Sequence, residues 1–221
     1  MGHPIVVSVS VSAAHTINFA ASQTLPGAKG LSAVLTGALV SGGIATLASP
    51  GRVTITSAGN DSGITFTITG TSAPYQNAGG PLVETITGGN VAAVSTTQDF
   101  ATVSSVLASG PTASTITGGS SGVASGPWTP WDQYQTSFQV SLVGYITSGT
   151  PAWGVEYTYD DVYGLYLPAG TLFPRPIAMA TMPLTNTASP LDGFLTSPVR
   201  ATRLTVNGTG TVQLTSTQQG M

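Results

Sequence analysis

The residues of this chain that can do acid–base or metal chemistry are few and widely spaced. The two histidines are His3 and His15. Neither belongs to a recognisable set of nucleophile, base and orienting acid, so we interpret both as surface or packing residues. The chain contains no cysteine, which excludes disulfide bonds, thiolate metal sites and a cysteine nucleophile.

Three carboxylates, Glu156, Asp160 and Asp161, lie close together in the sequence. Such a cluster could bind Ca²⁺, which takes about six or more oxygen ligands, and a pair of carboxylates can hydrolyse a glycosidic bond. No Asp-x-Asp-x-Asp-Gly loop follows, and nothing in the sequence indicates a sugar cleft. We therefore interpret the cluster as a solvated strand end, and we expect no catalytic residue, no metal site and no cofactor.

Aromatic and basic residues in the second half form a candidate contact surface. Trp and Tyr are enriched at protein contacts, so we expect a mixture of core and interface, with an exposed carbohydrate platform as the alternative. Two of the arginines lie three positions apart on one expected strand and face opposite sides. One could pair with Glu156 or Asp160 on a neighbouring strand while the other reaches a partner subunit. The candidate interface residues are Trp128, Trp131, Trp153, Tyr163, Tyr166, Arg200 and Arg203.

The composition limits the classes of partner. Only 6% of the residues are charged and 41% are hydrophobic, whereas about 25% of a typical soluble domain is charged. Five Lys and Arg residues cannot form a basic face for nucleic acid, and the apolar fraction excludes ordinary disorder. There is no basic signal-peptide start before Lys29 and no membrane-length apolar run. We therefore expect synthesis in the cytoplasm, no nucleic-acid or membrane partner, and a surface that packs against other protein.

Apolar and polar residues alternate along much of the chain, as expected for half-buried strands. The clearest example is the Val–Ser alternation from Val7 to Ser12. This pattern predicts an all-β fold with two jelly-roll-like β-sandwich domains. Further strands are predicted at 52–57, 64–70, 83–88, 100–107, 115–117, 138–146, 153–159, 200–206 and 211–216, with two short ones around 33–40 and 44–48.

Glycine, proline and other turn residues predict how these strands connect. Turn sequences at 58–61, 148–151 and 207–210 predict three β-hairpins. Prolines between residues 160 and 195 predict a long loop or a set of broken edge strands. A Gly/Ser-rich stretch before Pro127 predicts a flexible linker over 120–127. It would join an N-terminal β domain, 1–119, to a C-terminal β-sandwich domain, 128–221.

Several short motifs follow one another in a specific order. Residues 53–71 are followed by a Val-Glu-Thr-Ile-Thr-Gly strand at 83–88 and by Phe-Ala-Thr-Val at 100–103. The second half continues with motifs at 126–128, 138–142, 155–161, 198–206 and 212–220. This order resembles that of tailed-bacteriophage virion structural proteins of the head decoration or cement type. The chain departs from the pattern at 72–80 and in the proline-rich segment 163–190.

The resemblance implies a non-enzymatic virion protein, synthesised in the host bacterial cytoplasm. Its expected role is that of a capsid decoration or cement protein, which binds and stabilises the major capsid shell. The expected partners are the major capsid protein and further copies of the chain. Threefold positions of an icosahedral lattice favour trimers. A tail or head–tail connector component is the first alternative, and a carbohydrate-binding spike module is the second.

Overall fold

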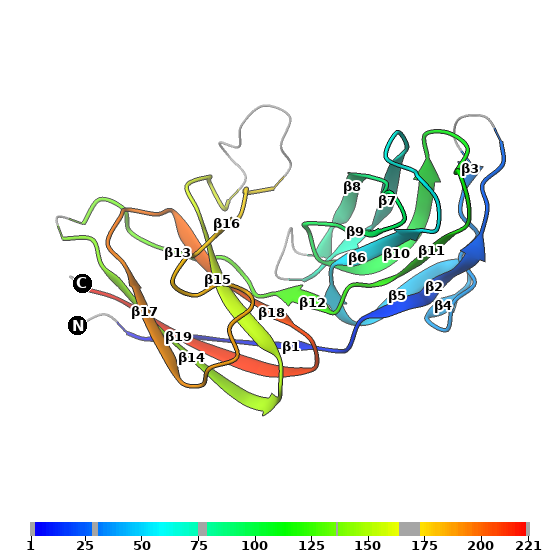
Figure 1. The fold of residues 1–221 in the computed structure, drawn as a ribbon. Helices are drawn as coiled ribbons and strands as arrows, with labels where there is room; N and C mark the ends of the chain where they lie inside the picture. The colour runs from blue at the N-terminus through cyan, green and yellow to red at the C-terminus, as the bar shows by residue number, and fades with distance from the viewer. Residues whose placement is uncertain (1–2, 28–30, 75–78, 136, 164–172, 220–221) are drawn as a thin grey trace. The chain divides into compact units, whose positions relative to one another are not determined.

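The computed structural model describes residues 3–27, 31–74, 79–135, 137–163 and 173–219. Within these ranges the named elements are all β-strands (Figure 1), so the predicted all-β class is confirmed. The chain forms two compact units. We call residues 12–124 the inserted unit, and residues 1–11 together with 125–221 the split unit.

The inserted unit contains two antiparallel sheets. One has the strand order β4-β5-β10-β7-β8, with β3 also pairing with β10, and the other has the order β2-β11-β6-β9. The strands are β2 (His15–Gln23), β3 (Leu31–Ser32), β4 (Val40–Ser41), β5 (Ile44–Gly51), β6 (Val53–Ser57), β7 (Thr65–Ser72), β8 (Pro81–Thr87), β9 (Ala93–Ser95), β10 (Phe100–Ala108) and β11 (Ile116–Ser120).

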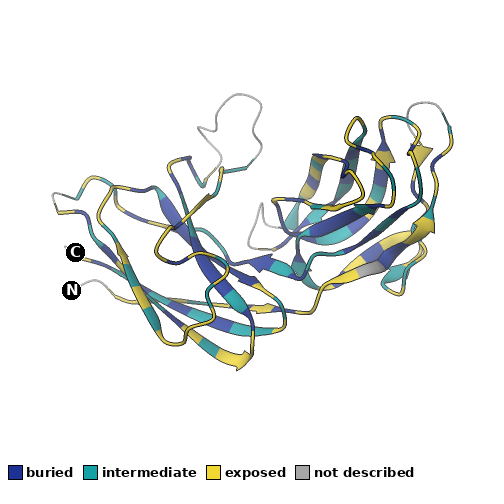
Figure 2. Cartoon of the chain, in the orientation of Figure 1, coloured by how far each residue is buried: buried dark blue, intermediate teal, exposed yellow. Residues whose placement is uncertain are grey.

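Alternating apolar side chains build the core of this unit. Every second residue of β7 is buried, including Phe66 and Ile68, which are fully inaccessible. The second sheet contributes Phe19 and Ile55, which are also buried. Figure 2 shows the alternation as dark bands along the strands. The core therefore forms from the period-two pattern that predicted the strands.

The split unit also contains two sheets. One has the order β1-β19-β14-β17, and the other has the order β12-β18-β15-β16, with β13 also pairing with β18. The strands are β1 (Ile5–Val11), β12 (Val123–Ser125), β13 (Thr129–Pro130), β14 (Val140–Gly149), β15 (Ala152–Thr158), β16 (Ile177–Ala178), β17 (Leu191–Leu195), β18 (Ala201–Asn207) and β19 (Gly210–Gln218). The boundary between the units falls within β12, of which Ser125 belongs to the split unit.

Trp153 is the centre of the core of the split unit. Its side chain is fully buried, and its Nε1 donates a hydrogen bond to the carbonyl of Ala188 at 3.0 Å. The indole packs against Gly144 of the opposite sheet, where an added Cβ would lie only 2.0 Å from the ring. Glycine at 144 therefore makes the room that the large indole needs between the sheets.

The three predicted hairpins are wrong. β6 pairs with β9 and β11, whereas β7 pairs with β8 and β10. Likewise β14 pairs with β17 and β19, but β15 and β18 belong to the other sheet of the split unit. All three turns therefore connect the two sheets of a unit instead of neighbouring strands in one sheet. A short turn allows either route, and only long-range pairing decides between them.

The structure divides the chain differently from the predicted boundaries at 119 and 128. β1 pairs along its length with β19, so residues 1–11 belong with the C-terminal half. The Gly/Ser-rich segment is not an open linker, because it contains β11 and β12. Its glycines have two structural roles. A Cβ at Gly118 would lie only 2.3 Å from the Phe19 ring, and Gly122 adopts a φ of +74°, a backbone conformation that favours glycine.

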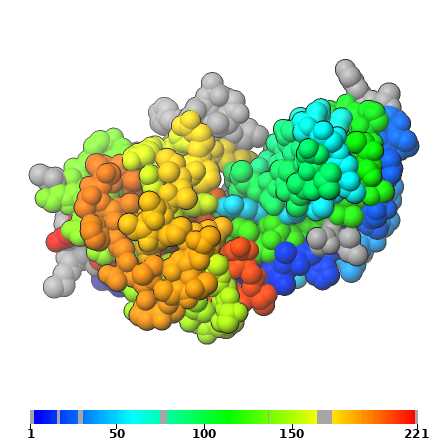
Figure 3. All heavy atoms as spheres, viewed as in Figure 1, coloured from blue at the N-terminus to red at the C-terminus, as the bar shows by residue number. Residues whose placement is uncertain are grey.

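Two other regions were predicted with partial success. Residues 33–39 form no strand, whereas β5 covers the predicted strand at 44–48. Gly42 and Gly43, with φ of +59° and +78°, form the two-residue turn between β4 and β5, which is the conformation that such a turn requires. The proline-rich segment supplies the short edge strands β16 and β17, as predicted for broken edge pieces. Its residues 173–195 form much of the near surface of the split unit, gold to orange in Figure 3.

Candidate functional site

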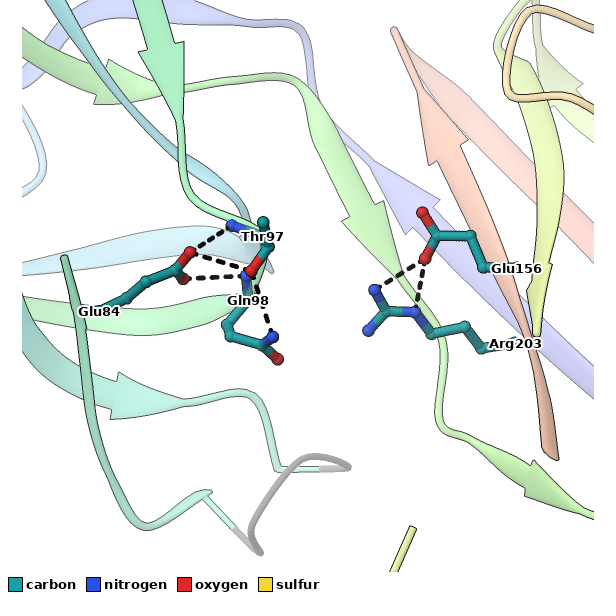
Figure 4. Close-up of polar contacts among 5 residues, drawn as sticks. All are labelled: Glu84, Thr97, Gln98, Glu156 and Arg203. Atoms are coloured by element: carbon teal, nitrogen blue, oxygen red, sulfur yellow. Dashed lines mark hydrogen bonds and ion pairs between the residues drawn. The ribbon is translucent and has the colours of Figure 1, made fainter. Parts of the chain in front are cut away.

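The strand pair β15–β18 brings an acid and a base together inside the split unit. Glu156 and Arg203 are direct register partners. The Arg203 Nε donates to Glu156 Oε2 at 2.8 Å, and its Nη2 lies 2.7 Å from the same oxygen (Figure 4). The Arg203 side chain is only 1% exposed. The predicted pairing of one arginine with Glu156 is therefore confirmed.

Two tryptophans flank β18 at this point. The guanidinium carbon of Arg203 lies 4.6 Å from the centroid of the Trp128 ring, which adds a cation–π contact to the ion pair. Trp131 is buried and donates its Nε1 hydrogen to Thr202 Oγ1 at 2.9 Å. The guanidinium of Arg203 is thus paired with the Glu156 carboxylate and lies over the Trp128 ring, both within the same chain. This arrangement holds the segment before β14 against the sheet.

Asp160 is held by the arginine of the proline-rich segment. Arg175 donates from Nε to Asp160 Oδ2 at 2.8 Å and from Nη2 to Oδ1 at 2.7 Å. Its backbone N–H also donates to Oδ2 at 2.8 Å. The side-chain hydrogen bond from Arg175 is the main cause that lowers the pKa of Asp160 below 3.8, while burial opposes the shift.

The neighbouring Asp161 makes a looser pair with Arg200, whose Nη2 lies 3.5 Å from Asp161 Oδ1. Asp160 and Asp161 are 8% and 5% exposed. They are therefore buried and paired, and the predicted solvated strand end is wrong for these two residues. The cause lies in Arg175 and Arg200, which approach from outside the strand and compensate the buried charge.

These contacts determine what the cluster can do chemically. Each of the three carboxylates faces a guanidinium, so none is placed as a free base or as part of a shared metal-binding set. In the part of the chain that the structure describes, no three His, Asp or Glu side chains gather as a metal site would require. The two histidines lie exposed, before β1 and at the start of β2. The cluster is therefore a structural ion-pair group.

The predicted interface residues have different environments. Trp153 and Trp131 are core residues, and Arg203 is buried beneath the half-buried Trp128. Arg200 is partly exposed but engaged with Asp161. Tyr163 is 69% exposed, and Tyr166 lies outside the described residues. Of the described members of this set, Tyr163 is the one aromatic residue that is largely exposed. Trp131 and Trp153 are buried, because their large indole rings fill the interior of the split unit.

The outward face of the sheet β1-β19-β14-β17 is a broad surface that the sequence did not single out. One row across it consists of Val6, Thr215, Val143 and Asp192, which are register partners. The exposed aromatic residues of this face are Tyr145, which is 42% exposed, and Phe194, which is 63% exposed. The outward positions are Val6, Ser8, Ser10, Ser141, Val143, Tyr145, Thr147, Asp192, Phe194, Thr211, Gln213, Thr215 and Thr217. Asp192 is the one charged residue among them.

The inserted unit also uses its carboxylates to position loops. Glu84 Oε1 accepts hydrogen bonds from the backbone N–H and the hydroxyl of Thr97, at 2.7 and 3.0 Å. Its Oε2 accepts the backbone N–H of Gln98 at 3.0 Å (Figure 4). Sequence reasoning missed this role and that of Arg175, because neither residue lies near its partner in the chain.

Comparison of the chain with protein-family models, with curated protein sequences and with solved structures finds no match. Among the described residues there is no helix that could cross a membrane.

Proposed function

We propose that this protein is a bacteriophage virion structural protein that binds the capsid shell as a decoration or cement protein. The observation that carries the proposal is the outward face of the sheet β1-β19-β14-β17, whose outward positions hold a single charged residue, Asp192. The cores of protein interfaces are depleted in charge in the same way. The order of short motifs, which resembles that of virion proteins, supports the choice of a capsid as the partner.

The internal pairing of charges supports a role in assembly. Arg175, Arg200 and Arg203 each face a carboxylate of their own chain. They are therefore not free cations for steering an acidic partner. Contact with a shell would depend on apolar area and on Ser and Thr hydroxyl groups, so binding should change little with salt. Many equivalent shell sites allow modest affinity per copy.

Counting copies in purified virions by quantitative mass spectrometry tests the proposal. A cement protein should be present in a number comparable to the capsid subunits. A small fixed number, as in a ring, would assign the protein to the tail or the head–tail connector and overturn the proposed role. Absence from the particle would overturn any virion role.

A surface variant tests the face itself. Tyr145→Lys places a charge on the outward face, where we expect it to reduce co-sedimentation with shells prepared without this protein. Val83→Lys is the matched control, because Val83 is 44% exposed on a strand of the inserted unit, close to the 42% of Tyr145. Equal loss of binding in both variants would show that this face is not the contact surface.

A further inference from the structure

The turn that joins β18 to β19 contains a chemically unstable pair of residues. Asn207 is the last residue of β18, and Gly208 and Thr209 belong to no strand before β19 begins at Gly210. The backbone nitrogen of the residue after an asparagine can attack the side-chain carboxamide and close a succinimide ring, which makes asparagine thermolabile. The rate at a given asparagine depends on the residue that follows it and on how tightly the local backbone is held.

Both partners of this reaction are accessible at the turn. Asn207 is exposed to solvent. Gly208 has no Cβ to hinder the approach of its nitrogen to the Asn207 carboxamide. The backbone N–H of Gly208 must lose its proton before the nitrogen can attack, and among the described residues no group accepts a hydrogen bond from it. The nucleophile is therefore not held by the fold.

The other asparagines that the structure describes lack this combination. Asn60 is followed by an aspartate whose backbone N–H donates to a carbonyl of another loop at 2.9 Å. Asn90 is followed by a β-branched valine whose N–H is also bonded, at 2.9 Å. Asn18 and Asn186 use their side chains in hydrogen bonds, and neither precedes a glycine. Asn207 is thus distinguished both by its neighbour and by its freedom from local hydrogen bonds.

We propose that Asn207 is a modification site, at which the folded chain converts spontaneously to aspartate and isoaspartate. The deprotonated nitrogen of Gly208 bonds to Cγ of Asn207, the carboxamide C–N bond breaks, and the leaving nitrogen takes up a proton and departs as ammonia. Water then hydrolyses the succinimide. Cleavage of the new Cγ–N bond gives aspartate, whereas cleavage of the backbone C–N bond gives isoaspartate, with the main chain passing through Cγ. The net reaction consumes one water and releases one ammonia.

The two products affect the protein differently. Each adds one negative charge to a chain whose net charge is −3. Isoaspartate also adds a CH₂ group to the main chain, where it passes from one sheet of the split unit to the other. The turn is closely packed, because a Cβ added at Gly210 would lie 2.3 Å from the carbonyl oxygen of Ser148. We therefore expect the isoaspartate form to be the less stable of the two. The inference does not depend on the virion role.

Peptide mass spectrometry of the full chain, stored folded at neutral and at mildly alkaline pH, tests the site. Replacement of the amide NH₂ by OH changes the peptide mass, and backbone fragmentation distinguishes isoaspartate from aspartate. Asn207 should convert several-fold faster than Asn18, Asn60, Asn90 or Asn186. Its rate should increase with pH, because the Gly208 nitrogen must first lose its proton. An unchanged Asn207, or rates that are alike at these residues, would overturn the proposal.

Two further measurements separate the effect of the fold from that of the sequence. In the urea-unfolded chain Asn207 should convert at a rate within a few-fold of that in the folded chain, because the fold does not hold the Gly208 N–H. Strong protection of Asn207 by folding would show that the turn withholds the reaction. Asn207→Gln is the matched variant, since it keeps an exposed carboxamide but must close a larger ring, and it should abolish the conversion. Conversion at the wild-type rate in this variant would contradict the mechanism. Circular dichroism confirms that the variant is folded.

Discussion

At the scale of single residues, this chain places its few charges where they hold the structure. Arg203 is the clearest case, because its buried guanidinium contacts both Glu156 and the Trp128 ring. We expect Arg203→Ala to lower the free energy of unfolding by about 2–4 kcal/mol, since it removes a buried guanidinium from a carboxylate of low exposure. Chemical denaturation measures the loss.

The matching control for this prediction removes both charges. Arg203→Met combined with Glu156→Gln should cost clearly less than the sum of the two single changes, because no uncompensated charge remains. Additive costs would show that the pair does not interact as the geometry indicates.

A second residue-scale prediction concerns the pH dependence from Asp160. Its pKa is lowered in the folded protein, so the folded state favours the carboxylate relative to the unfolded chain. The resulting stabilisation is complete well above pH 3.8 and is lost as the pH falls through 3.8 towards the folded-state pKa. Asp160→Asn should therefore be less stable than the wild type at neutral pH, and the difference should shrink on acidification. A difference that is constant down to strongly acidic pH would contradict the assignment.

At the scale of elements, the two sheets of the split unit fit together where Gly144 of β14 faces Trp153 of β15. A Cβ at 144 would lie within 2.6 Å of three indole atoms. We expect Gly144→Ala to destabilise the protein by about 1–3 kcal/mol, the usual cost of overpacking a core. Thermal or chemical unfolding measures it.

Two further variants make this element-scale prediction specific. Gly63→Ala should be tolerated, because an added Cβ there meets nothing within 4 Å. In a Trp153→Leu background, Gly144→Ala should cost less than in the wild type, because the smaller side chain leaves room. An unchanged cost in that background would show that Trp153 is not the obstacle.

At the scale of the whole molecule, the chain leaves the split unit after β1 and returns to it at residue 125. We expect a fragment of residues 12–124 to unfold cooperatively by itself. A fragment of 125–221 should be unstable, because β19 then lacks the strand that pairs along it. Joining residues 3–11 to the C-terminus of that fragment through a flexible linker should restore folding. Equal stability with and without β1 would contradict the split organisation.

The sequence by itself determined where most strands lie and that the fold is all-β, and it narrowed the partner of one arginine to Glu156 or Asp160. These features follow from local alternation and from the scarcity of charge. It did not determine which sheet each strand joins, as the three turns at 58–61, 148–151 and 207–210 show. Nor did it place β1 beside β19, or Trp131 and Trp153 in the core. Strand pairing and side-chain burial depend on residues far apart in the chain, and a short turn permits either sheet, so only the tertiary structure could decide them.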